Sequence, residues 1–157
     1  MHFQHFVRIP DDIQSLSHND VHGIISTKQN ELYLATFGGG LNKLLSLDSL
    51  GNARFQSYSV EDGLPSDVLL TIQEDAKGNL WISTENGICK YTPSNGHFEK
   101  YNDRSLPFRV RFSESSSGYT SHNHIMFGTN KGIVLFNPDS IRKSSYVPPI
   151  VFSNLLV

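Results

Sequence analysis

The sequence lacks several features that would assign it to a specialised class of protein. Its single cysteine, Cys89, cannot form an intramolecular disulfide, and its neighbours Ile88 and Lys90 do not mark it as a nucleophile, so we expect it to fill the core. No apolar run approaches the roughly 18 residues of a membrane span. The first ten residues, MHFQHFVRIP, have neither the basic end nor the apolar centre of a signal peptide. As written, the chain is expected to stay in the cytoplasm.

A strong charge of either sign is also lacking. The formal net charge is −2 at pH 7 and no basic tract occurs, so nothing predicts nucleic acid or an anionic membrane surface as a partner. With 38% hydrophobic and 11% aromatic residues, the 157-residue chain can bury an ordinary core and is not disordered by composition. The chain therefore has the mass of one folded domain.

What the sequence does contain is a repeat. Short apolar runs alternate with turn residues along residues 63–101, which predicts four short strands joined by hairpins. One of these strands, residues 80–84 (LWIST), has counterparts 48 residues earlier at 32–36 (LYLAT) and 45 residues later at 125–129 (IMFGT). In each copy the fourth residue is small and the fifth is Thr. The small residue predicts close approach of a neighbouring sheet, and the Thr hydroxyl can bond the turn that follows.

The turns are repeated as well. A glycine that can adopt a positive φ angle follows each Thr, at Gly40, Gly87 and Gly132. In the preceding hairpin Gly78 is replaced by Asn30 or Asn123, and Asn is the next residue that tolerates the left-handed region. Repeats of 40 to 50 residues built from four strands are typical of propeller blades. We therefore predict an all-β fold, a partial β-propeller of four-stranded antiparallel blades.

The ends of the chain do not contain full repeats. Residues 3–6 (FQHF) share the F-x-x-aromatic spacing of residues 55–58 and 98–101, the fourth strands of the fuller repeats. The third repeat has a candidate strand at 108–112 and a polar, Ser-rich stretch at 113–124, and no F-x-x-Y strand follows it. The last blade of a closed propeller is commonly completed by a strand from the start of the propeller. We therefore expect the third repeat to be the last blade.

These patterns divide the chain into six predicted units. They are the last strand of a truncated blade (1–10), two blades (14–58 and 63–101), a terminal blade (104–138), a linker (139–147) and the first strand of another, immunoglobulin-like β domain (148–157).

The motifs resemble a known family. Residues 63–66 (GLPS), Asp75, 78–84 (GNLWIST), Gly87 and Tyr91 are similar to the repeat of two-component regulator propellers, with Ser83 where the family usually has Gly. Residues 130–140 and 147–149 resemble the last blade of those proteins and its join to their Y_Y_Y immunoglobulin-like domain.

The resemblance implies a function for the parent protein. Such propellers are periplasmic sensor parts of hybrid two-component histidine kinases, which respond to glycan fragments and switch on carbohydrate-utilisation genes. The implied partners are an oligosaccharide, the remaining blades and Y_Y_Y domain of the parent chain, and a second parent subunit. Kinase, receiver and DNA-binding modules do not occur in this sequence, so this chain is expected not to be an enzyme.

Candidate chemical groups were weighed against simpler roles. His18 and His22 are four residues apart, but they straddle a loop and a strand start, where that spacing does not bring two metal ligands together. Paired acids such as Glu74 and Asp75 lie at turns, where solvated or capping roles are commoner than catalysis. We therefore expect no metal, no cofactor and no catalytic residue.

Ligand contacts are expected from loops held by the rigid blades. In a propeller, the loops that enter the inner strands and those that join second to third strands share one face near the central channel. An aromatic ring such as that of Phe37 among polar groups would suit a sugar, although ordinary turn roles explain each position as well. The candidate ligand-binding residues are Asn19, Asp20, Phe37, Ser66, Asp67, Glu85, Asn86, Asn130 and Lys131.

Two other readings of the sequence stay open. A propeller lectin or propeller enzyme would use the same face of polar loops, with further groups from blades outside this chain. A gene remnant without a function of its own would leave apolar faces, such as that around Trp81, open to water and would self-associate.

Overall fold

The computed structural model describes residues 3–102, 106 and 109–142. Its strands form three antiparallel sheets, which we call blades 1, 2 and 3. Blade 1 contains β1 (Val21–Ser26), β2 (Leu32–Thr36), β3 (Leu41–Leu47) and β4 (Ala53–Tyr58). Blade 2 contains β5 (Leu69–Glu74), β6 (Leu80–Thr84), β7 (Gly87–Thr92) and β8 (His97–Tyr101). Blade 3 contains β9 (Phe112–Tyr119), β10 (Ile125–Thr129) and β11 (Gly132–Phe136).

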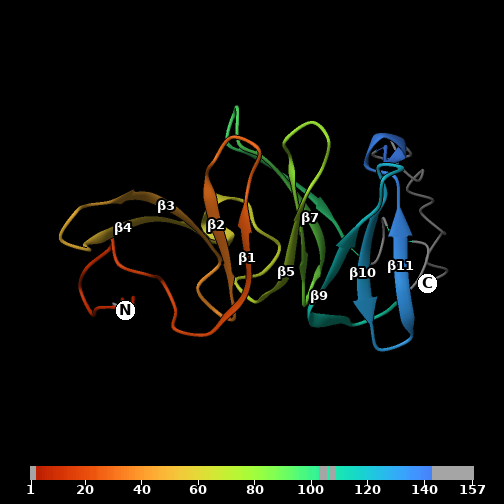
Figure 1. Cartoon of the computed structure of the whole chain (residues 1–157). Coiled ribbons are helices and arrows are strands. Elements are labelled where there is room, and N and C mark those ends of the chain that lie inside the picture. The colour runs from red at the N-terminus through yellow and green to blue at the C-terminus, as the bar shows by residue number, and fades with distance from the viewer. Residues whose placement is uncertain (1–2, 103–105, 107–108, 143–157) are drawn as a thin grey trace, which may run out of the picture.

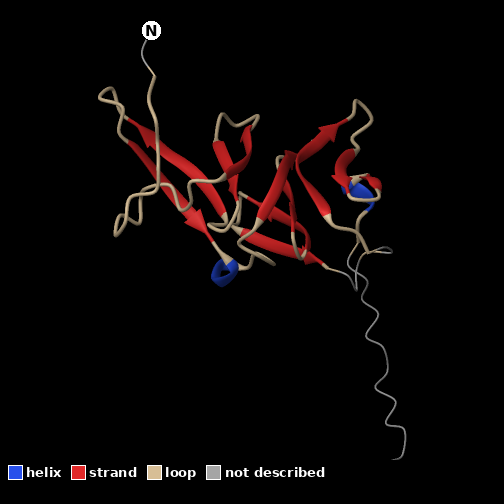
Figure 2. Cartoon of the chain, turned by 90° about the horizontal axis from the view of Figure 1, so that it is seen from below, coloured by secondary structure: helices blue, strands red, loops and turns tan. Residues whose placement is uncertain are grey.

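The blades stand side by side with blade 2 in the middle (Figure 1). Within each blade consecutive strands pair with one another, and the first strands, β1, β5 and β9, pack together across the three blades. Two short 3-10 helices, η1 (Val60–Asp62) and η2 (Pro138–Ser140), complete the described elements (Figure 2). The predicted all-β fold of propeller-like blades is confirmed. No helix within the described ranges is long and apolar enough to cross a membrane.

The three aligned strands of the repeat coincide with β2, β6 and β10. The positions predicted to need a positive φ angle also have one: Gly78 lies at 83° and its replacement Asn30 at 59°. The Thr at the end of each strand bonds the next turn as expected; Thr84 Oγ1 donates to the Gly87 carbonyl at 3.0 Å and accepts from the Asn86 N–H at 3.1 Å. The turn chemistry read from the sequence therefore holds in three dimensions.

A β-bulge lies opposite the small residue of each aligned strand. In blades 1 and 2 the register shifts by one residue, between Val21 and Gly23 and between Leu69 and Thr71. In blade 3 the shift is larger, because Phe127 pairs with Ser117 whereas Thr129 pairs with Phe112. A methyl group on Gly128 would lie 2.0 Å from Ser116 Oγ. At Gly128 the crowding that requires a small residue comes from the bulged neighbouring strand of the same blade.

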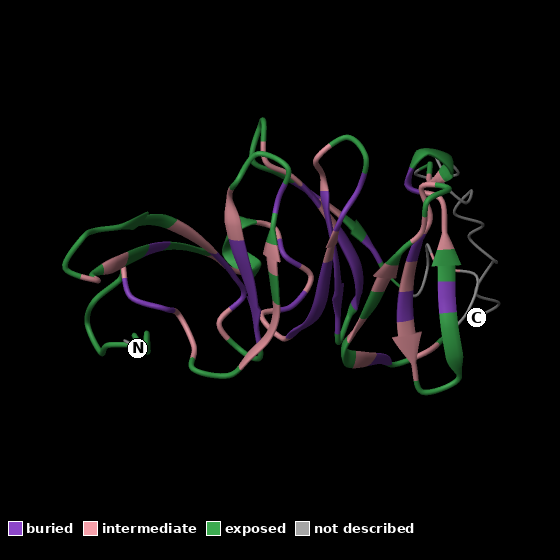
Figure 3. Cartoon of the chain, viewed as in Figure 1, coloured by how far each residue is buried: buried purple, intermediate pink, exposed green. Residues whose placement is uncertain are grey.

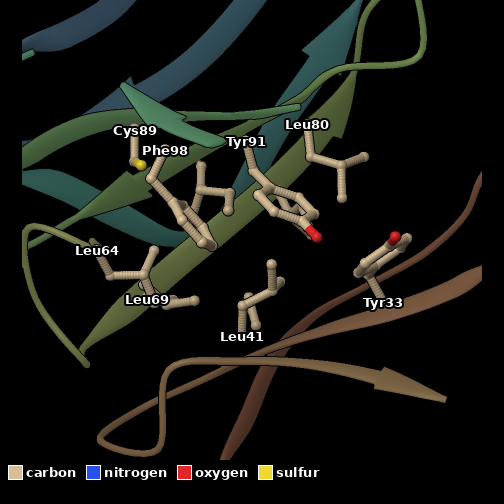
Figure 4. Close-up of a cluster of buried hydrophobic side chains, with 11 residues drawn as sticks. Tyr33, Leu41, Leu64, Leu69, Leu80, Cys89, Tyr91 and Phe98 are labelled. Carbon is tan, nitrogen blue, oxygen red and sulfur yellow. The ribbon is translucent and has the colours of Figure 1, made fainter. Parts of the chain in front are cut away.

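The core is organised as two layers between the blades. Tyr33 and Leu41 of blade 1 face Tyr91 and Phe98 of blade 2 in one cluster (Figure 4). Trp81 of blade 2 belongs to the second cluster, which reaches into blade 3. The buried residues accordingly concentrate in and around the middle blade (Figure 3). Each blade is therefore stabilised mainly by the apolar surface that its neighbour covers.

The F-x-x-Y spacing contributes to both layers, because residues three apart in a strand point to opposite faces. Phe98 faces blade 1, with ring centroids 4.5 Å from Tyr91 and 5.8 Å from Tyr58. Tyr101 faces blade 3 and stacks on Trp81 at 5.6 Å. Trp81 is only 1% exposed. The expectation that the apolar face around Trp81 would be open to water is therefore wrong, because blade 3 covers it.

Two strand predictions are also wrong. Residues 3–6 form no strand, because they have no partner strand among the described residues, and Phe3 is 84% exposed. In the third repeat, residues 109–111 are not in a strand, and the Ser-rich stretch forms β9 instead. Pairing with β10 and packing against β5 decide this outcome; Thr71 Oγ1 donates to Ser117 Oγ at 2.8 Å. Residues 143–157, which include the predicted immunoglobulin-like strand, lie outside the described residues.

Candidate ligand site at the loop edge

The candidate ligand-binding residues lie on loops at one edge of the blades, which we call the loop edge. Strands β1, β5 and β9 begin there, and β2, β6 and β10 end there because each runs antiparallel to the strand before it. This is the lower edge in Figure 1. The loop edge therefore collects side chains from all three blades, as the sequence predicted for a propeller.

The same backbone contact places these loops in each blade. The residue after the Thr that ends each aligned strand donates its N–H to the carbonyl of the residue that precedes the first strand of the blade, as Phe37 N does to the Asp20 carbonyl at 2.9 Å. Glu85 N donates to the Val68 carbonyl at 3.3 Å, and Asn130 N to the Arg111 carbonyl at 2.9 Å. Phe37, Glu85 and Asn130 thus occupy equivalent positions, although their side chains differ completely. The same backbone position therefore presents a different side chain in each blade.

Phe37 is the most prominent group of blade 1 at this edge. Its side chain is 39% exposed, and its ring lies 4.9 Å from that of His22 at a tilt of 41°. His22 Nε2 lies 3.3 Å from Asp20 Oδ1. The Asp20 N–H in turn donates to His18 Nδ1 at 3.1 Å. The aromatic ring of Phe37 therefore packs against His22, which lies beside the largely exposed carboxylate of Asp20.

Asp67 joins blade 2 to the turn that carries Phe37. Its carbonyl oxygen accepts from Gly38 N at 3.0 Å and from Gly40 N at 2.9 Å. Its side-chain Oδ1 accepts from the Val60 N–H at 2.9 Å. The turn of blade 1 is thus fixed by the backbone of blade 2, so the Phe37 ring has a defined position relative to both blades.

Ser66, Glu85 and Asn86 form a second group on blade 2. Ser66 is buried, and its hydroxyl donates to Glu85 Oε1 at 2.9 Å. The Asn86 amide donates to the Pro65 carbonyl at 3.3 Å. Glu85 and Asn86 themselves are exposed. Ser66 therefore orients an exposed carboxylate and does not itself face the solvent.

The remaining candidates are less closely connected. Asn19 Oδ1 accepts from the Arg8 N–H at 2.6 Å, which turns this side chain toward the N-terminal segment. Asn130 Oδ1 accepts from the Arg111 N–H at 2.9 Å within blade 3. Lys131 is exposed in the same turn, and its N–H donates to Thr129 Oγ1 at 3.1 Å. The structure thus brings Asp20, Phe37 and Asp67 together, and places Asn130 and Lys131 apart on blade 3.

Two residues near this group were not among the candidates. His22 supports Phe37, and its buried Nδ1 has no hydrogen-bond partner among the described residues. Ser115 has a φ angle of 49°, and its hydroxyl crosses from the β9 bulge of blade 3 to the His22 carbonyl of blade 1 at 2.6 Å. The i, i+4 spacing of His18 and His22 suggested only a metal-ligand role for His22, not a contact with Phe37. The contact from Ser115 had no sequence signal, because it depends on a bulge.

The chemistry of the loop edge is that of a hydrogen-bond acceptor surface beside an aromatic ring. Asp20 and Glu85 are exposed carboxylates, and Asp67 is half-buried. Carboxylates accept hydrogen bonds from hydroxyl groups, and a partly exposed ring provides an apolar face. Within the described ranges, no group of three or more His, Cys, Asp or Glu side chains could hold a metal ion. The arrangement suits a neutral ligand that is rich in hydroxyl groups.

The sequence comparisons identify the repeat. Residues 63–86 match the family model of the two component regulator propeller. Over 104 residues the chain is 25% identical to histidine kinase P4 of Formosa agariphila, which corresponds to 66% of this chain and 8% of that protein. The predicted two-component regulator propeller repeat is therefore confirmed in blade 2.

Solved structures show the same fold. The chain is similar to the extracellular domain of the hybrid two component system BT3049 from B. thetaiotaomicron, with a TM-score of 0.57 and 23% identity over 96% of this chain and 26% of that one. It is also similar to the extracellular domain of the hybrid two component system BT4673 from the same organism, with a TM-score of 0.58 and 22% identity over 79% of this chain and 16% of that one. The chain spans about a quarter or less of each relative.

Proposed function

We propose that this chain is part of the extracytoplasmic ligand-sensing propeller of a hybrid two-component signalling protein, and that it senses oligosaccharides to control carbohydrate-utilisation genes. The observation that carries the proposal is the two component regulator propeller match at residues 63–86, within a fold shared with extracellular domains of hybrid two component systems. The family match is to a propeller repeat, and the similar structures are extracellular domains. The chain's own role in the proposal is to bind and not to catalyse.

The loop edge supports an oligosaccharide as the ligand. A sugar ring presents an apolar face and a rim of hydroxyl groups, which fits one aromatic ring beside several acceptors. Phe37 provides the ring, and Asp20 and Glu85 provide exposed acceptors on blades 1 and 2. Because acceptors with negative charge dominate this group, a neutral sugar fits better than an acidic one.

The position of the group also gives a route for a signal. Asp67 of blade 2 holds the turn that carries Phe37 of blade 1 through two backbone hydrogen bonds. A sugar that contacts Phe37 and Glu85 together would therefore favour one relative placement of the two blades. A ligand shifts a conformational equilibrium only by its differential affinity for the two states, and contacts that bridge a joint supply such a difference.

The test is calorimetric titration of the chain with a panel of neutral plant and bacterial oligosaccharides. We expect one class to bind, and Phe37→Ala to weaken that binding about fivefold, because an aromatic contact is worth roughly 1 kcal/mol. Tyr119→Ala is the matched control, because Tyr119 is equally exposed, at 40%, but is the last residue of β9 and so lies at the opposite edge of the blades from Phe37. Its hydroxyl donates to Asn123 Oδ1 there. Binding that falls equally in both variants, or no binding by any neutral oligosaccharide, would contradict the proposal.

A propeller lectin would pass the same titration. The two functions separate in the complete gene, because only a sensor requires a membrane span followed by histidine kinase and receiver modules. A strain in which the Phe37→Ala change in that gene abolishes sugar-induced transcription would establish the sensor, and unchanged induction would favour the lectin.

A further inference from the structure

The bulge in β9 brings blade 3 into direct contact with blade 1, although blade 2 stands between them (Figure 1). Residues 113–116 form this bulge and lie opposite Gly128 alone. Ser115, within the bulge, has a φ angle of 49°, and its hydroxyl donates to the His22 carbonyl of β1 at 2.6 Å. Strands β1 and β9 also pack against each other. Blade 3 therefore reaches the strand that supports the Phe37 ring.

The residue that receives this hydrogen bond has a special place in its own sheet. His22 is the extra residue of the β1 bulge, because the pairing with β2 shifts between Val21 and Gly23. A bulged residue is left out of the strand ladder, and bulges often re-aim a side chain beside a functional site. The Ser115 hydroxyl thus fixes a point of β1 that the ladder of blade 1 leaves unpaired.

Blade 2 shows what this position requires when it only stabilises the fold. Its bulge lies between Leu69 and Thr71, so Leu70 is the equivalent residue. Leu70 is 6% exposed and belongs to the apolar layer between blades 2 and 3. In blade 1 this place is taken by His22, whose buried Nδ1 has no partner among the described residues. A polar ring at an apolar position costs stability, and such departures from a local pattern are expected at functional sites.

The imidazole of His22 is the surface on which Phe37 packs. The two ring centroids are 4.9 Å apart, and the Phe37 side chain is 39% exposed. A hydrogen bond to the His22 carbonyl restrains that peptide group, and therefore the direction in which the imidazole projects. The Asp67 carbonyl restrains the backbone of the Phe37 turn separately. The ring of Phe37 is thus fixed by two contacts, one from blade 2 and one that begins in blade 3.

We propose that Ser115 is a positioning residue of the ligand site, whose hydroxyl fixes His22 so that His22 orients the Phe37 ring for a sugar. The inference rests on the proposed function, because it concerns the same site. Ser115 acts through His22 and needs no contact with the ligand. The site then depends on all three blades, and a change in the placement of blade 3 alters the affinity for a sugar at blade 1.

Three variants separate the hydroxyl from the backbone of the bulge. Ser115→Gly removes the hydroxyl and keeps the bulge, because glycine adopts a positive φ angle at no steric cost. Ser115→Asn is the rescue variant, since Asn tolerates the left-handed region and its amide can donate to a carbonyl. Ser117→Ala is the matched control, because it removes a hydroxyl of the same strand that accepts from Thr71 of blade 2 at 2.8 Å. Urea unfolding shows whether each variant is folded.

The first test uses the chain without ligand. It measures the nuclear Overhauser effect between the ring protons of His22 and those of Phe37. We expect this effect to fall at least about twofold in Ser115→Gly, because the lost hydrogen bond lets His22 leave its position. It should recover in Ser115→Asn and equal that of the parent chain in Ser117→Ala. An undiminished effect in Ser115→Gly, or an equal loss in Ser117→Ala, would overturn the proposal.

The second test measures the affinity for the neutral oligosaccharide of the panel that binds the parent chain. Ser115→Gly should weaken binding about threefold, and should have no further effect when Phe37→Ala is also present, because residues that act through one another are not additive. Equal losses with and without the Phe37 ring would show that Ser115 does not act through it. If no neutral oligosaccharide binds, the proposed function fails, and the ring contact in the first test still decides whether Ser115 positions Phe37.

Discussion

Trp81 Nε1 donates a hydrogen bond of 2.9 Å to Asp75 Oδ2, and both residues are buried. The Asp75 carboxylate also accepts from the backbone N–H groups of Lys77 and Asn79 and from the Asn79 amide. One buried carboxylate therefore closes the hairpin between β5 and β6 and orients the indole that packs between blades 2 and 3. Thr27 and Thr120 take its place in the other blades, where their hydroxyls accept from the equivalent turn.

Replacing this carboxylate should destabilise the chain. In Asp75→Asn an amide N–H₂ faces donors in place of an oxygen, so we expect the free energy of unfolding to fall by about 3 kcal/mol. Urea unfolding followed by the fluorescence of the single tryptophan measures it. Asp48→Asn is the control, because Asp48 makes the same turn contacts with Leu50 and Asn52 in an exposed hairpin. Equal losses in the two variants would show that burial of Asp75 has no special importance.

A side chain at Gly128 should disturb blade 3. In Gly128→Ala the new methyl group would collide with Ser116 of the large bulge, and we expect a loss of about 1–3 kcal/mol in unfolding free energy. Removing the opposing side chain in Ser116→Gly/Gly128→Ala should recover part of it. Blade 1 already has Ala35 in this column, opposite its smaller bulge. If the double variant is no more stable than Gly128→Ala alone, the contact with Ser116 is not the cause.

The pair of Glu31 and Lys43 should contribute a small pH-dependent stability. The Lys43 ammonium holds the pKa of the Glu31 carboxyl below its ordinary value of 4.5. A lowered pKa in the folded state stabilises the protein above the unfolded pKa, and the contribution is lost as the pH falls through the folded value. Lys43→Met should therefore cost under about 1 kcal/mol at pH 7, since water screens the pair, and less below pH 4.5.

That difference is measured by urea unfolding of the parent chain and Lys43→Met at several pH values. Tyr33 donates its hydroxyl to the same carboxylate at 3.0 Å, so Tyr33→Phe should act in the same direction. A stability difference for Lys43→Met that grows as the pH falls would refute the assigned role of the pair.

Cys89 should be unreactive in the folded chain. Burial raises the pKa of its thiol to about 12, and the thiolate is the reactive form. We expect a thiol-specific chromogenic reagent to label it only after unfolding, whereas an exposed thiol in Val60→Cys reacts at once. Rapid labelling of Cys89 in native conditions would show that the layer between blades 1 and 2 opens readily.

The sequence predicted those elements whose determinants are local. The Thr hydroxyl, the positive φ angle at Asn30 and the alternation of strand and turn all act within a few residues, so aligning LWIST with its two copies located β2, β6 and β10. The Ser-rich β9 was missed because its strand conformation comes from pairing with β10 and contact with β5. Its composition alone argues against a buried inner strand.

The candidate site was predicted only in outline. The topology of a propeller predicts that these loops share one edge, and therefore that Asp20 and Phe37 lie near each other. The support of Phe37 by His22 depends on how a ring packs across a bulged strand, which no spacing in the sequence encodes. Whether these residues bind a sugar stays a prediction that the titrations decide.

The two hydrogen bonds from Gly38 and Gly40 to the Asp67 carbonyl mean that the Phe37 loop of one repeat is shaped by the next repeat along the chain. A blade is thus not an independent module in evolution or engineering. A chimaera with a recombination breakpoint between residues 58 and 67 would contain the Phe37 loop without the native Asp67 segment, whose carbonyl fixes the loop backbone. Exchange of specificity between such proteins should succeed when adjacent repeats move together.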